Sequence, residues 1–381
     1  MNTEKTNMRS INTILFIIES LGPGGAERQL VGLAAMLKGL GYEIVVFTYT
    51  KNEFYLPFLI ESDVKYNRFD KASSRSKRLF ILSNAVNKLA PDVVISFNDG
   101  PNLLSCLLRV FGHKFKLIVS ERNTNQNLKL TFKDIVKFNF YRKADYIVAN
   151  SFTQKEFIKN KFTTLTNKLF TITNFTDINI FSPISSQTIK NTTLCICVGR
   201  LVPQKNVHLF IKAIAKLKDK GYMLKVKWYG YVQDEDEYSS KCLSLIKYYN
   251  LQKIFTFEEP TKLIHDEYQK ANLFCLPSLH EGYPNALCEA MSSGLPVLCS
   301  NVSDNPILVV NNVNGFVFDP NDINKIVNSF INFFSLSKLE KKKMGELNRS
   351  KAKSIFSKEV FLKKYLQLID PKNNDLNIRS I

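Results

Sequence analysis

Two glutamates flank the predicted start of a short helix in the stretch LPSLHEGYPNALCEAMSSGLPVLCS, residues 276–300. Glu281 precedes the helix-start residues Pro284 and Asn285, and Glu289 lies about one turn inside the helix. A carboxylate accepts two hydrogen bonds and therefore suits the vicinal hydroxyls of a ribose or a hexose. The spacing predicts a site for a phosphorylated sugar, although an ordinary loop glutamate and a solvated helix glutamate fit it equally well.

The backbone at the same helix start is suited to an anion. Unpaired N–H groups and the positive end of a helix attract negative charge, so a diphosphate fits there. The residues concerned are Tyr283, Pro284, Asn285 and Ala286. The stretch therefore predicts contacts to both the phosphates and the sugars of one ligand.

Two cations follow another predicted strand, Leu194–Val198. Arg200 and Lys205 lie in the sequence GRLVPQKN, before a predicted helix at Val207–Lys218. Arginine binds phosphate through two parallel hydrogen bonds, and lysine binds it as a point charge. The pair predicts a second phosphate-binding element, with a solvated loop as the alternative.

A glycine-rich turn in the N-terminal part offers a further place for phosphate. Gly24 and Gly25 open an amphipathic helix and allow close approach to the backbone. A dinucleotide site would require G-x-G-x-x-G, but Glu27 occupies the third glycine position, and the strand Glu43–Thr48 is not followed by an acidic residue. A nicotinamide cofactor is therefore disfavoured, whereas a purely structural glycine turn remains an alternative.

Alternating strands and helices must position these groups, which indicates an α/β fold built from parallel sheets. A chain of 381 residues is too long for one ordinary core and predicts two domains, with a linker near Phe181–Asn191. We expect an N-terminal domain over 1–181 and a C-terminal domain over 190–361. Further strands are expected at Asn12–Glu19, Asp92–Phe97, Leu117–Ser120, Tyr146–Ala149, Leu224–Tyr229, Ile254–Phe257, Leu273–Leu276 and Pro296–Cys299.

EGYPNALCEAM followed by GLPV resembles the signature of family four of the retaining glycosyltransferases, which have the GT-B architecture. The resemblance implies two doubly wound, Rossmann-like domains facing a cleft, with the last helix, about residues 362–381, packing back on the first domain. It assigns Glu281 to the donor sugar, Glu289 to the nucleotide ribose, and the intervening amides to the diphosphate. Arg200 and Lys205 resemble the phosphate-binding pair of the family, and GPGGAER, with Gly24 and Gly25, resembles its N-terminal glycine loop.

The resemblance implies transfer of a hexose or N-acetylhexosamine from a nucleoside diphosphate sugar, with UDP-sugar as the expected donor, to a glycan or lipid-linked acceptor in surface polysaccharide biosynthesis. The expected route retains the anomeric configuration, and the leaving phosphate helps to take the acceptor proton. Arg200, Lys205 and the helix amides would stabilise the leaving diphosphate, and Glu281 would orient the sugar. No cofactor or metal is expected. A sugar-nucleotide epimerase or hydrolase on the same scaffold and a basic nucleic-acid-binding protein are the alternatives.

The sequence SERN, Ser120 to Asn123, follows a predicted strand and resembles a subgroup that assembles bacterial lipid-linked or surface glycans. Ligands bind at strand carboxyl ends in open parallel sheets, so Glu121, Arg122 and Asn123 are assigned to the acceptor side. Many relatives carry a histidine at the end of this strand, and this chain does not. The group that activates the acceptor is therefore left open.

The predicted helix Lys129–Ala144 carries Lys129, Lys133 and Lys137 at intervals of four, followed by Arg142 and Lys143. A basic stripe beside large apolar side chains is typical of a helix on an anionic membrane surface. A solvated helix face over an ordinary core is the alternative.

The formal net charge of +18 indicates an anionic partner, which can be nucleic acid, a membrane surface or a phosphorylated substrate. A nucleic-acid-binding protein would gather its basic residues among stacking aromatics, whereas the positive charges here are spread over both predicted domains, which disfavours nucleic acid. No apolar run reaches the roughly 18 to 20 residues of a membrane-spanning helix. We therefore expect a cytoplasmic protein, peripheral on the inner face of the cell membrane if the stripe binds lipid.

Seven cysteines without a C-x-x-C pair predict reduced core residues rather than disulfides or a zinc site. His280-Glu281 lacks the second histidine of H-E-x-x-H. Asp234-Glu235-Asp236 matches the D-x-D metal motif of the other glycosyltransferase architecture, but acidic residues are expected there from the helix dipole alone. The sequence thus predicts no metal site.

Overall fold

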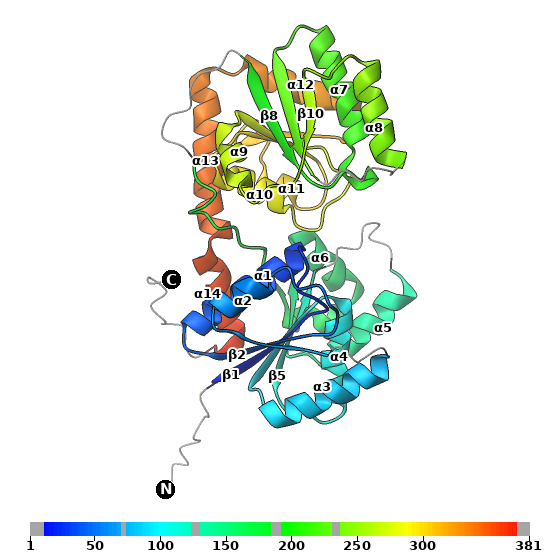
Figure 1. The fold of residues 1–381 in the computed structure, drawn as a ribbon, viewed down its shortest axis with the longest axis vertical. Helices are drawn as coiled ribbons and strands as arrows, with labels where there is room; N and C mark the ends of the chain where they lie inside the picture. Colours follow the sequence, from blue (N-terminus) through cyan, green and yellow to red (C-terminus); the bar gives the residue numbers. More distant parts are fainter. Residues whose placement is uncertain (1–10, 70–73, 123–129, 184–191, 231–236, 372–381) are drawn as a thin grey trace. The chain divides into compact units, whose positions relative to one another are not determined.

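In the computed structural model the chain forms two compact units. Unit 1 comprises Met1–Thr173 and Phe361–Ile381, and unit 2 comprises Asn174–Val360 (Figure 1). The structure describes residues 11–69, 74–122, 130–183, 192–230 and 237–371. Among these residues, no helix is both long enough and apolar enough to span a membrane.

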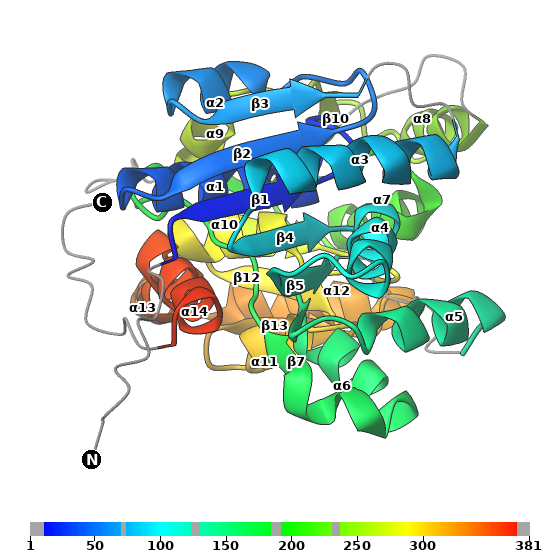
Figure 2. The same ribbon diagram turned by 90° about the horizontal axis from the view of Figure 1, so that it is seen from below.

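A parallel sheet of seven strands forms the centre of unit 1, in the order β3-β2-β1-β4-β5-β6-β7 (Figure 2). The strands are β1 (Thr13–Ile17), β2 (Glu43–Thr48), β3 (Lys65–Arg68), β4 (Val93–Phe97), β5 (Lys116–Glu121), β6 (Tyr146–Ala149) and β7 (Leu169–Thr171). The helices are α1 (Gly25–Gly39), α2 (Leu56–Glu61), α3 (Arg75–Leu89), α4 (Asp99–Val110), α5 (Phe132–Tyr141), α6 (Phe152–Lys161), the 3-10 helix η1 (Thr163–Lys168) and α14 (Lys358–Ile369).

The strands of unit 1 are apolar because helices cover the sheet. All five residues of β4, VVISF, are buried, as expected for a parallel strand covered on both faces. One core cluster packs α3, α4, α5 and α6 against one face of the sheet, where Leu15, Val94 and Val119 point. The strand order reverses between β1 and β4, so the carboxyl ends of these two strands mark the switch point at which such sheets bind ligands.

The last helix, α14, belongs to unit 1 although it follows unit 2 in the chain. The Lys116 ammonium, at the start of β5, donates hydrogen bonds to the backbone carbonyls of Leu368 (3.3 Å) and Ile369 (2.5 Å). Arg122, after β5, donates to the hydroxyl of Tyr365 at 3.0 Å. These contacts attach both ends of β5 to the same helix.

A parallel sheet of six strands forms the centre of unit 2, in the order β10-β9-β8-β11-β12-β13. The strands are β8 (Thr193–Val198), β9 (Leu224–Tyr229), β10 (Phe255–Glu258), β11 (Leu273–Leu276), β12 (Val297–Ser300) and β13 (Gly315–Phe318). The helices are the 3-10 helix η2 (Pro203–Lys205), α7 (Val207–Asp219), α8 (Glu237–Tyr248), α9 (Ile264–Lys270), α10 (Asn285–Ser292), α11 (Asn305–Leu308), α12 (Ile323–Ser335) and α13 (Lys338–Phe356).

Two core clusters cover the two faces of this sheet. One contains Phe210 of α7, Cys242 of α8 and Phe330 of α12. The other contains Tyr268 of α9 and Phe356 of α13, together with the apolar residues of α10. The strand order reverses between β8 and β11, which therefore form the switch point of unit 2.

The α/β prediction with two doubly wound parallel sheets is confirmed. The units divide between Thr173 and Asn174, whereas the sequence analysis ended the first domain at residue 181. The segment after Thr173 is tied into unit 2, because Asn174 donates to the side chain of Asn285 at 2.7 Å and Asp177 pairs at 2.5 Å with Lys358. The first three residues of α14, 358–360, belong to unit 2.

All seven cysteines are free and buried, as the sequence analysis predicted. Burial raises the pKa of the Cys275 thiol to about 11 and that of Cys106 to about 12. These thiols therefore behave as small apolar core residues.

Candidate functional site

The switch point of unit 2 brings Lys205 and Glu281 together. Lys205 lies in the loop after β8, and Glu281 lies in the loop after the neighbouring strand β11. The Lys205 ammonium donates a hydrogen bond to the Glu281 carboxylate at 2.6 Å. The two side chains are 16% and 8% exposed, so the ion pair is largely withdrawn from water while still reaching the surface.

The backbone around Glu281 is fixed from two sides. The Ser303 hydroxyl donates to the Glu281 carbonyl at 2.6 Å, and its Oγ atom accepts from the Glu281 N–H at 3.2 Å. On the other side, the Leu279 N–H donates to the Gln204 carbonyl at 2.8 Å, and the Gln204 side chain donates to the His280 carbonyl at 2.9 Å. Residues after β8 and β12 thus hold the backbone of the loop that carries Glu281.

His280 contributes a neutral ring beside this pair. Burial lowers the pKa of His280 and nearby Lys205 lowers it further, while Glu281 acts in the opposite direction. The imidazole is therefore mainly uncharged near neutral pH.

Glycines allow the Lys205 side chain to lie against the end of β8. A Cβ at Gly199 would lie 3.0 Å from the Cε atom of Lys205, and a Cβ at Gly230 would lie 1.9 Å from the Gly199 carbonyl oxygen. The indole of Trp228 donates to that same carbonyl at 2.8 Å. Arg200, directly after Gly199, is exposed. The two predicted cations therefore differ in their surroundings: Lys205 is partly buried and paired with Glu281, whereas Arg200 is exposed to solvent.

Helix α10 begins at Asn285. Not all of the amides predicted to bind phosphate at this helix start can donate to a ligand. Pro284 has no N–H, and the Asn285 N–H donates to the Tyr283 carbonyl at 3.0 Å. The first helical bond runs from Cys288 N–H to the Pro284 carbonyl, so the N–H groups of Ala286 and residue 287 have no acceptor inside the helix. These two donors are the better candidates for an anion.

Glu289 lies one turn inside α10 and is nearly buried. The hydroxyl of Tyr268, from α9, lies 3.2 Å from the Glu289 carboxylate and 3.2 Å from the Ala286 carbonyl. Tyr268 itself is fully buried against Phe181 and Phe274. A rigid aromatic side chain therefore sets the direction of the carboxylate that the sequence analysis assigned to the ribose.

In unit 1, the predicted glycines form the start of α1. Gly24 is the residue before the helix, and Gly25 is its first residue and is exposed. A Cβ at Gly24 would lie 2.0 Å from a carboxylate oxygen of Glu27. Burial raises the pKa of Glu27, Glu19 adds to the increase, and a hydrogen bond to its own backbone N–H opposes it. The chain's own carboxylate thus lies at this helix start, next to the place predicted for phosphate.

Glu121 and Arg122, which the sequence assigns to the acceptor side, are buried and contact other residues of unit 1, and their acceptor role stays a prediction. Glu121 is 0% exposed, and its carboxylate accepts a hydrogen bond from Tyr141 at 3.2 Å and lies 3.0 Å from the Lys137 ammonium. The Arg122 guanidinium lies 4.1 Å from the centre of the Phe97 ring and bonds to Tyr365. Burial lowers the pKa of Arg122, against the influence of Tyr365. Asn123 lies outside the described residues.

The basic stripe requires a correction, because Lys137 is an interior residue. Its side chain is 15% exposed and lies between Glu121, Asp99 (3.3 Å) and Asp134 (3.7 Å). Burial acts to lower the pKa of Lys137, but Glu121 and Asp99 raise it overall. Lys133, also on α5, is exposed, while Lys129 lies outside the described residues.

Two family models cover most of the chain. Residues 23–180 match the model described as Glycosyltransferase Family 4, and residues 182–351 match the model described as Glycosyl transferases group 1. A Campylobacter jejuni N-acetyl-D-galactosaminyltransferase acting on a diphosphoundecaprenol-linked GalNAc–GalNAc–diNAcBac glycan is 31% identical over 291 residues, which is 73% of this chain and 76% of that protein. The chain belongs to glycosyltransferase family 4.

Other relatives agree with this assignment. A second Campylobacter jejuni enzyme, an N-acetylgalactosamine-N,N'-diacetylbacillosaminyl-diphospho-undecaprenol 4-alpha-N-acetylgalactosaminyltransferase, is 28% identical over 304 residues, covering 74% of this chain and 79% of that protein. Among solved structures, Anabaena HepE in complex with UDP aligns with a TM-score of 0.83 at 18% identity, covering 94% of this chain and 100% of that one. The fold of the glycosyltransferase is thus GT-B.

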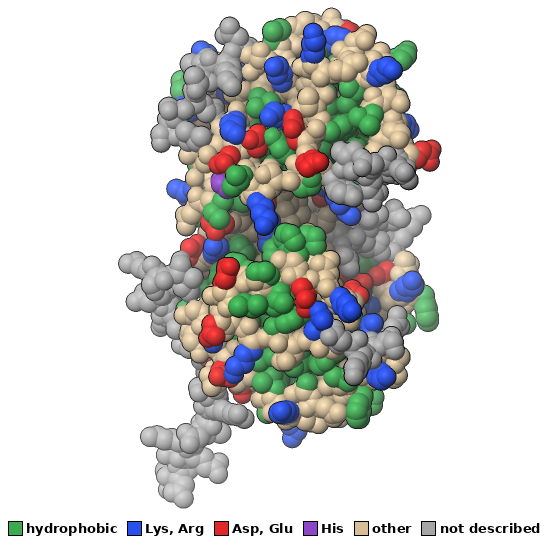
Figure 3. All heavy atoms as spheres, viewed as in Figure 1, with side chains coloured by type: hydrophobic (Ala, Val, Ile, Leu, Met, Phe, Trp, Pro, Cys, Tyr) green, Lys and Arg blue, Asp and Glu red, His purple; other side chains and the backbone are tan. Residues whose placement is uncertain are grey.

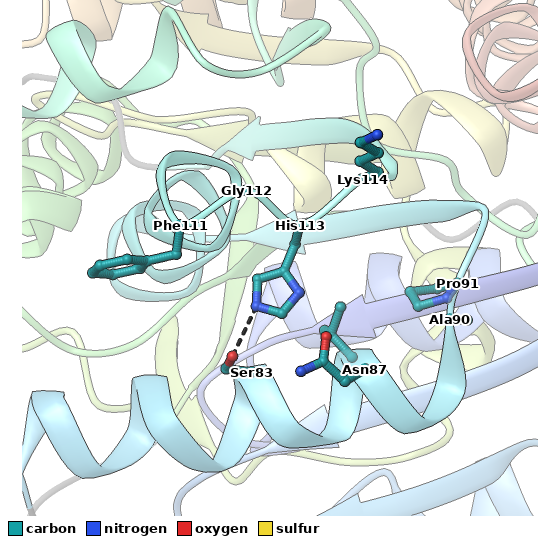
Figure 4. Close-up of a pocket in the computed structure, with 9 residues that line it drawn as sticks. Ser83, Asn87, Ala90, Pro91, Phe111, Gly112, His113 and Lys114 are labelled. Atoms are coloured by element: carbon teal, nitrogen blue, oxygen red, sulfur yellow. Dashed lines mark hydrogen bonds between the residues drawn. The ribbon is translucent and has the colours of Figure 1, made fainter.

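A cavity of about 570 Å³ in the glycosyltransferase lies away from all predicted site residues. It is lined by residues of α3 and of the turns after α3 and α4, at the amino edge of the sheet in unit 1 (Figure 4). The His113 ring points toward Ser83, and the Nε2 and Oγ atoms lie 2.7 Å apart. This bond connects α3 to the turn after α4.

Several residues that hold the candidate site were missed from the sequence, namely Gln204, Tyr268 and Ser303. Each acts through a partner 21 or more residues away, so no local spacing identifies it. Asp234 and Asp236 of the D-x-D sequence lie outside the described residues. Among the residues that the structure describes, no group of three or more His, Cys, Asp or Glu side chains is arranged to hold a metal ion.

Proposed function

We propose that this glycosyltransferase transfers a hexose or N-acetylhexosamine from a UDP-sugar to a glycan on undecaprenyl diphosphate, with retention at the anomeric carbon. The observation that carries the donor half is the Lys205–Glu281 pair at the switch point of unit 2. The diphosphate and the sugar of a nucleotide sugar adjoin each other. A cation that binds the diphosphate and a carboxylate that binds the sugar hydroxyls must therefore lie close together, as Lys205 and Glu281 do at 2.6 Å.

The donor is assigned to residues of unit 2 from their contacts. Glu289, directed by Tyr268, takes the ribose hydroxyls, and the free N–H groups at the start of α10 take the diphosphate. Arg200 approaches the same phosphates from solvent. UDP as the nucleotide is supported by the UDP bound in the structurally similar HepE. Gly24 and Gly25 of unit 1 remain predicted contacts to the diphosphate.

The acceptor is proposed from the relatives. Both Campylobacter jejuni enzymes are named for diphosphoundecaprenol-linked acceptors. An Escherichia coli relative, 32% identical over 142 residues, is named as a galactosyltransferase acting on GlcNAc-diphosphoundecaprenol. The shared feature of the three acceptors is the lipid diphosphate carrier, whereas the sugars differ.

In the proposed reaction, the bond between the anomeric carbon and the diphosphate oxygen breaks, and the acceptor oxygen bonds to the same face of that carbon. The acceptor proton passes to the leaving phosphate. Lys205 and Arg200 stabilise the negative charge that develops on the diphosphate, which is an electrostatic contribution. When the phosphate attracts Lys205, the Glu281 carboxylate is released to bind the sugar hydroxyls.

We expect no requirement for a divalent ion, because in the proposed site Arg200, Lys205 and the helix N–H groups supply the positive charge at the leaving group. Turnover should therefore survive EDTA. Loss of turnover with EDTA, restored by manganese, would favour the D-x-D metal site instead.

The reaction is tested by incubating the protein with a panel of UDP-sugars and synthetic undecaprenyl-diphosphate glycans. Release of UDP together with a product of higher mass supports the transfer, and NMR coupling constants of the new linkage report its configuration. Release of UDP without the acceptor would instead indicate a sugar-nucleotide hydrolase, and a changed sugar on intact UDP would indicate an epimerase.

The acceptor proposal includes docking of unit 1 on anionic lipid through α5. Around the start of this helix, Phe132 is 79% exposed, and Leu130, Ile135 and Val136 are exposed as well. Lys133 on the helix and Arg142 and Lys143 after it are also exposed. Apolar side chains beside basic ones fit a lipid surface, where each basic residue contributes about 1 kcal/mol.

Other basic side chains are scattered over both units on the face drawn in Figure 3 and do not form one continuous stripe. The lipid proposal therefore depends on α5 rather than on net charge. Changing Lys133, Arg142 and Lys143 to glutamate should release the protein from phosphatidylglycerol vesicles. The same change at the exposed Lys338, Lys342 and Lys343 of unit 2 serves as the control. Failure of the unchanged protein to sediment with these vesicles at low salt would refute docking.

A further inference from the structure

Asn206 is a buried asparagine at the junction between η2 and α7, and the sequence analysis gave it no role. Its φ of 57° and ψ of 32° place it in the left-handed region, which asparagine and glycine tolerate best. This conformation alone would be served equally well by glycine. The environment of the side chain shows that more is involved than backbone conformation.

The Asn206 side-chain amide joins two loops at the carboxyl edge of the sheet in unit 2. Its Nδ2 donates to the carbonyl of Pro277, after β11, at 3.2 Å and to the carbonyl of Pro320, after β13, at 2.7 Å. Both N–H bonds of the amide are therefore used, and the side chain is fully buried. Asn206 links the loop after β8 to the loops after β11 and β13.

The residues on either side of these bonds are those of the donor site. Lys205 immediately precedes Asn206, and Glu281 lies four residues after Pro277. Gln204 also bonds the loop after β11, through Leu279 and His280. Three consecutive residues, 204–206, thus hold the loop that carries Glu281, and Asn206 is the innermost and least exposed of the three.

We propose that Asn206 is a positioning residue of the transferase site, whose side-chain amide keeps the loop of Lys205 and the loop of Glu281 in register. This inference rests on the proposed function, because it concerns the same donor site. Asn206 does not touch the donor. It acts on UDP binding only through Lys205. If Asn206 positions Lys205, removing its side-chain bonds should reduce the effect of losing Lys205, whereas a purely conformational role would leave that effect unchanged.

The test is a double-mutant cycle on UDP affinity, measured by calorimetry with UDP as the probe. Asn206→Gly keeps the left-handed conformation and removes the two side-chain bonds. Asn250→Gly is the matched control, since Asn250 has a φ of 52°, is exposed and lies away from the donor residues. Each glycine variant is combined with Lys205→Ala.

In the unchanged and Asn250→Gly backgrounds, Lys205→Ala should weaken UDP binding by about tenfold. In the Asn206→Gly background, the same change should cost less than about threefold, because Lys205 is already misplaced. If Asn206→Gly does not fold, as judged by thermal unfolding, Asn206→Asp takes its place. Aspartate keeps the size of the side chain and replaces the donor with an acceptor facing two carbonyls.

A tenfold cost of Lys205→Ala in every background would overturn the inference and leave asparagine a conformational role alone. In that case the donor site would still stand, because UDP binds and Lys205 contributes. Absence of UDP binding by the unchanged protein would instead overturn the proposed function, and the inference with it.

Discussion

A lysine and a glutamate meet at the carboxyl edge of the sheet in both units, but their surroundings differ. Glu121 of unit 1 is completely buried and accepts from Tyr141 as well as from Lys137, which itself contacts two further carboxylates. Glu281 of unit 2 reaches the surface, and among the described residues Lys205 is the one side chain that forms a hydrogen bond or ion pair with its carboxylate.

The difference shows what a ligand can use. The bonding capacity of Glu121 is taken up by side chains of its own unit, and removing its partner would leave a charge in the interior. In unit 2 the backbone of the loop is held by Ser303 and Gln204, so the Lys205 and Glu281 side chains can separate without loosening it. A similar ion pair is therefore structural in one unit and exchangeable in the other.

The largest expected effect is on stability and comes from the pair in unit 1. Lys137→Met should lower the free energy of unfolding by roughly 3–5 kcal/mol, since it leaves Glu121 as an uncompensated buried charge. The exposed Lys133 on the same helix is the matched control, and Lys133→Met should stay within about 0.5 kcal/mol. Urea unfolding followed by circular dichroism measures both. Equal free energies of unfolding for the two variants would mean that the Lys137–Glu121 pair does not stabilise unit 1, and the contrast with unit 2 would fail.

The next effect is on turnover and comes from the pair in unit 2. Glu281→Ala should lower kcat on the order of a hundredfold, because the sugar is no longer oriented. UDP affinity should remain nearly unchanged, since UDP lacks the sugar that Glu281 binds. Glu289→Ala should instead weaken UDP, and calorimetry distinguishes the two variants. Equal losses of UDP affinity would show that the roles of the two glutamates are not divided.

A third prediction concerns the two cations. Arg200→Ala and Lys205→Ala should each reduce kcat/KM by an amount equivalent to about 1.5–3 kcal/mol, the range for hydrogen bonds to charged groups. Since both act on one diphosphate, the double variant should lose less than the sum. Strictly additive losses would argue that the exposed Arg200 and the paired Lys205 do not serve the same phosphates.

The smallest effect is expected at Glu27, the carboxylate at the start of α1. Its pKa is raised in the folded state, chiefly by burial, so the charged form is disfavoured by folding. Glu27→Gln should therefore stabilise the protein at pH 7, by less than about 1 kcal/mol because the group is partly exposed. The gain should disappear as the pH falls below the unfolded value of 4.5, where the carboxyl is protonated in both states. Thermal unfolding at pH 7 and pH 4 measures the difference, and a loss of stability at pH 7 would contradict it.

Most strands of the two sheets could be predicted because they are short apolar runs between helix signals. Strand β3, with the sequence KYNR, is not apolar and was not predicted. The expected strands Tyr146–Ala149, Leu224–Tyr229 and Leu273–Leu276 match β6, β9 and β11. The longest helix, α13, was not recognised. Its buried positions include Gly345 and Asn348, and its mean hydropathy is low, so the apolar periodicity that identifies most helices is weak.

The residues proposed to bind the donor in unit 2 could be selected from the sequence because they lie near one another along the chain and resemble a family signature. The setting of Lys137 could not be found in the same way. Lys137 lies four residues after Lys133, which suggested that both lie on one exposed face of the helix. However, the next residue, Phe138, and Tyr141 one turn later are buried, so Lys137 lies beside the interior face of α5. Only the position of α5 beside β5 reveals that Glu121 is the partner of Lys137.

The contribution of α14 to unit 1 has a consequence for the order of folding. A ribosome completes every residue of unit 2 before it adds Phe361–Ile381. Until then Arg122 lacks Tyr365 and Lys116 lacks the carbonyls of Leu368 and Ile369. Unit 1 is thus synthesised first but can complete its fold only after α14 has been made. Unit 2 can complete its hydrophobic core earlier during translation.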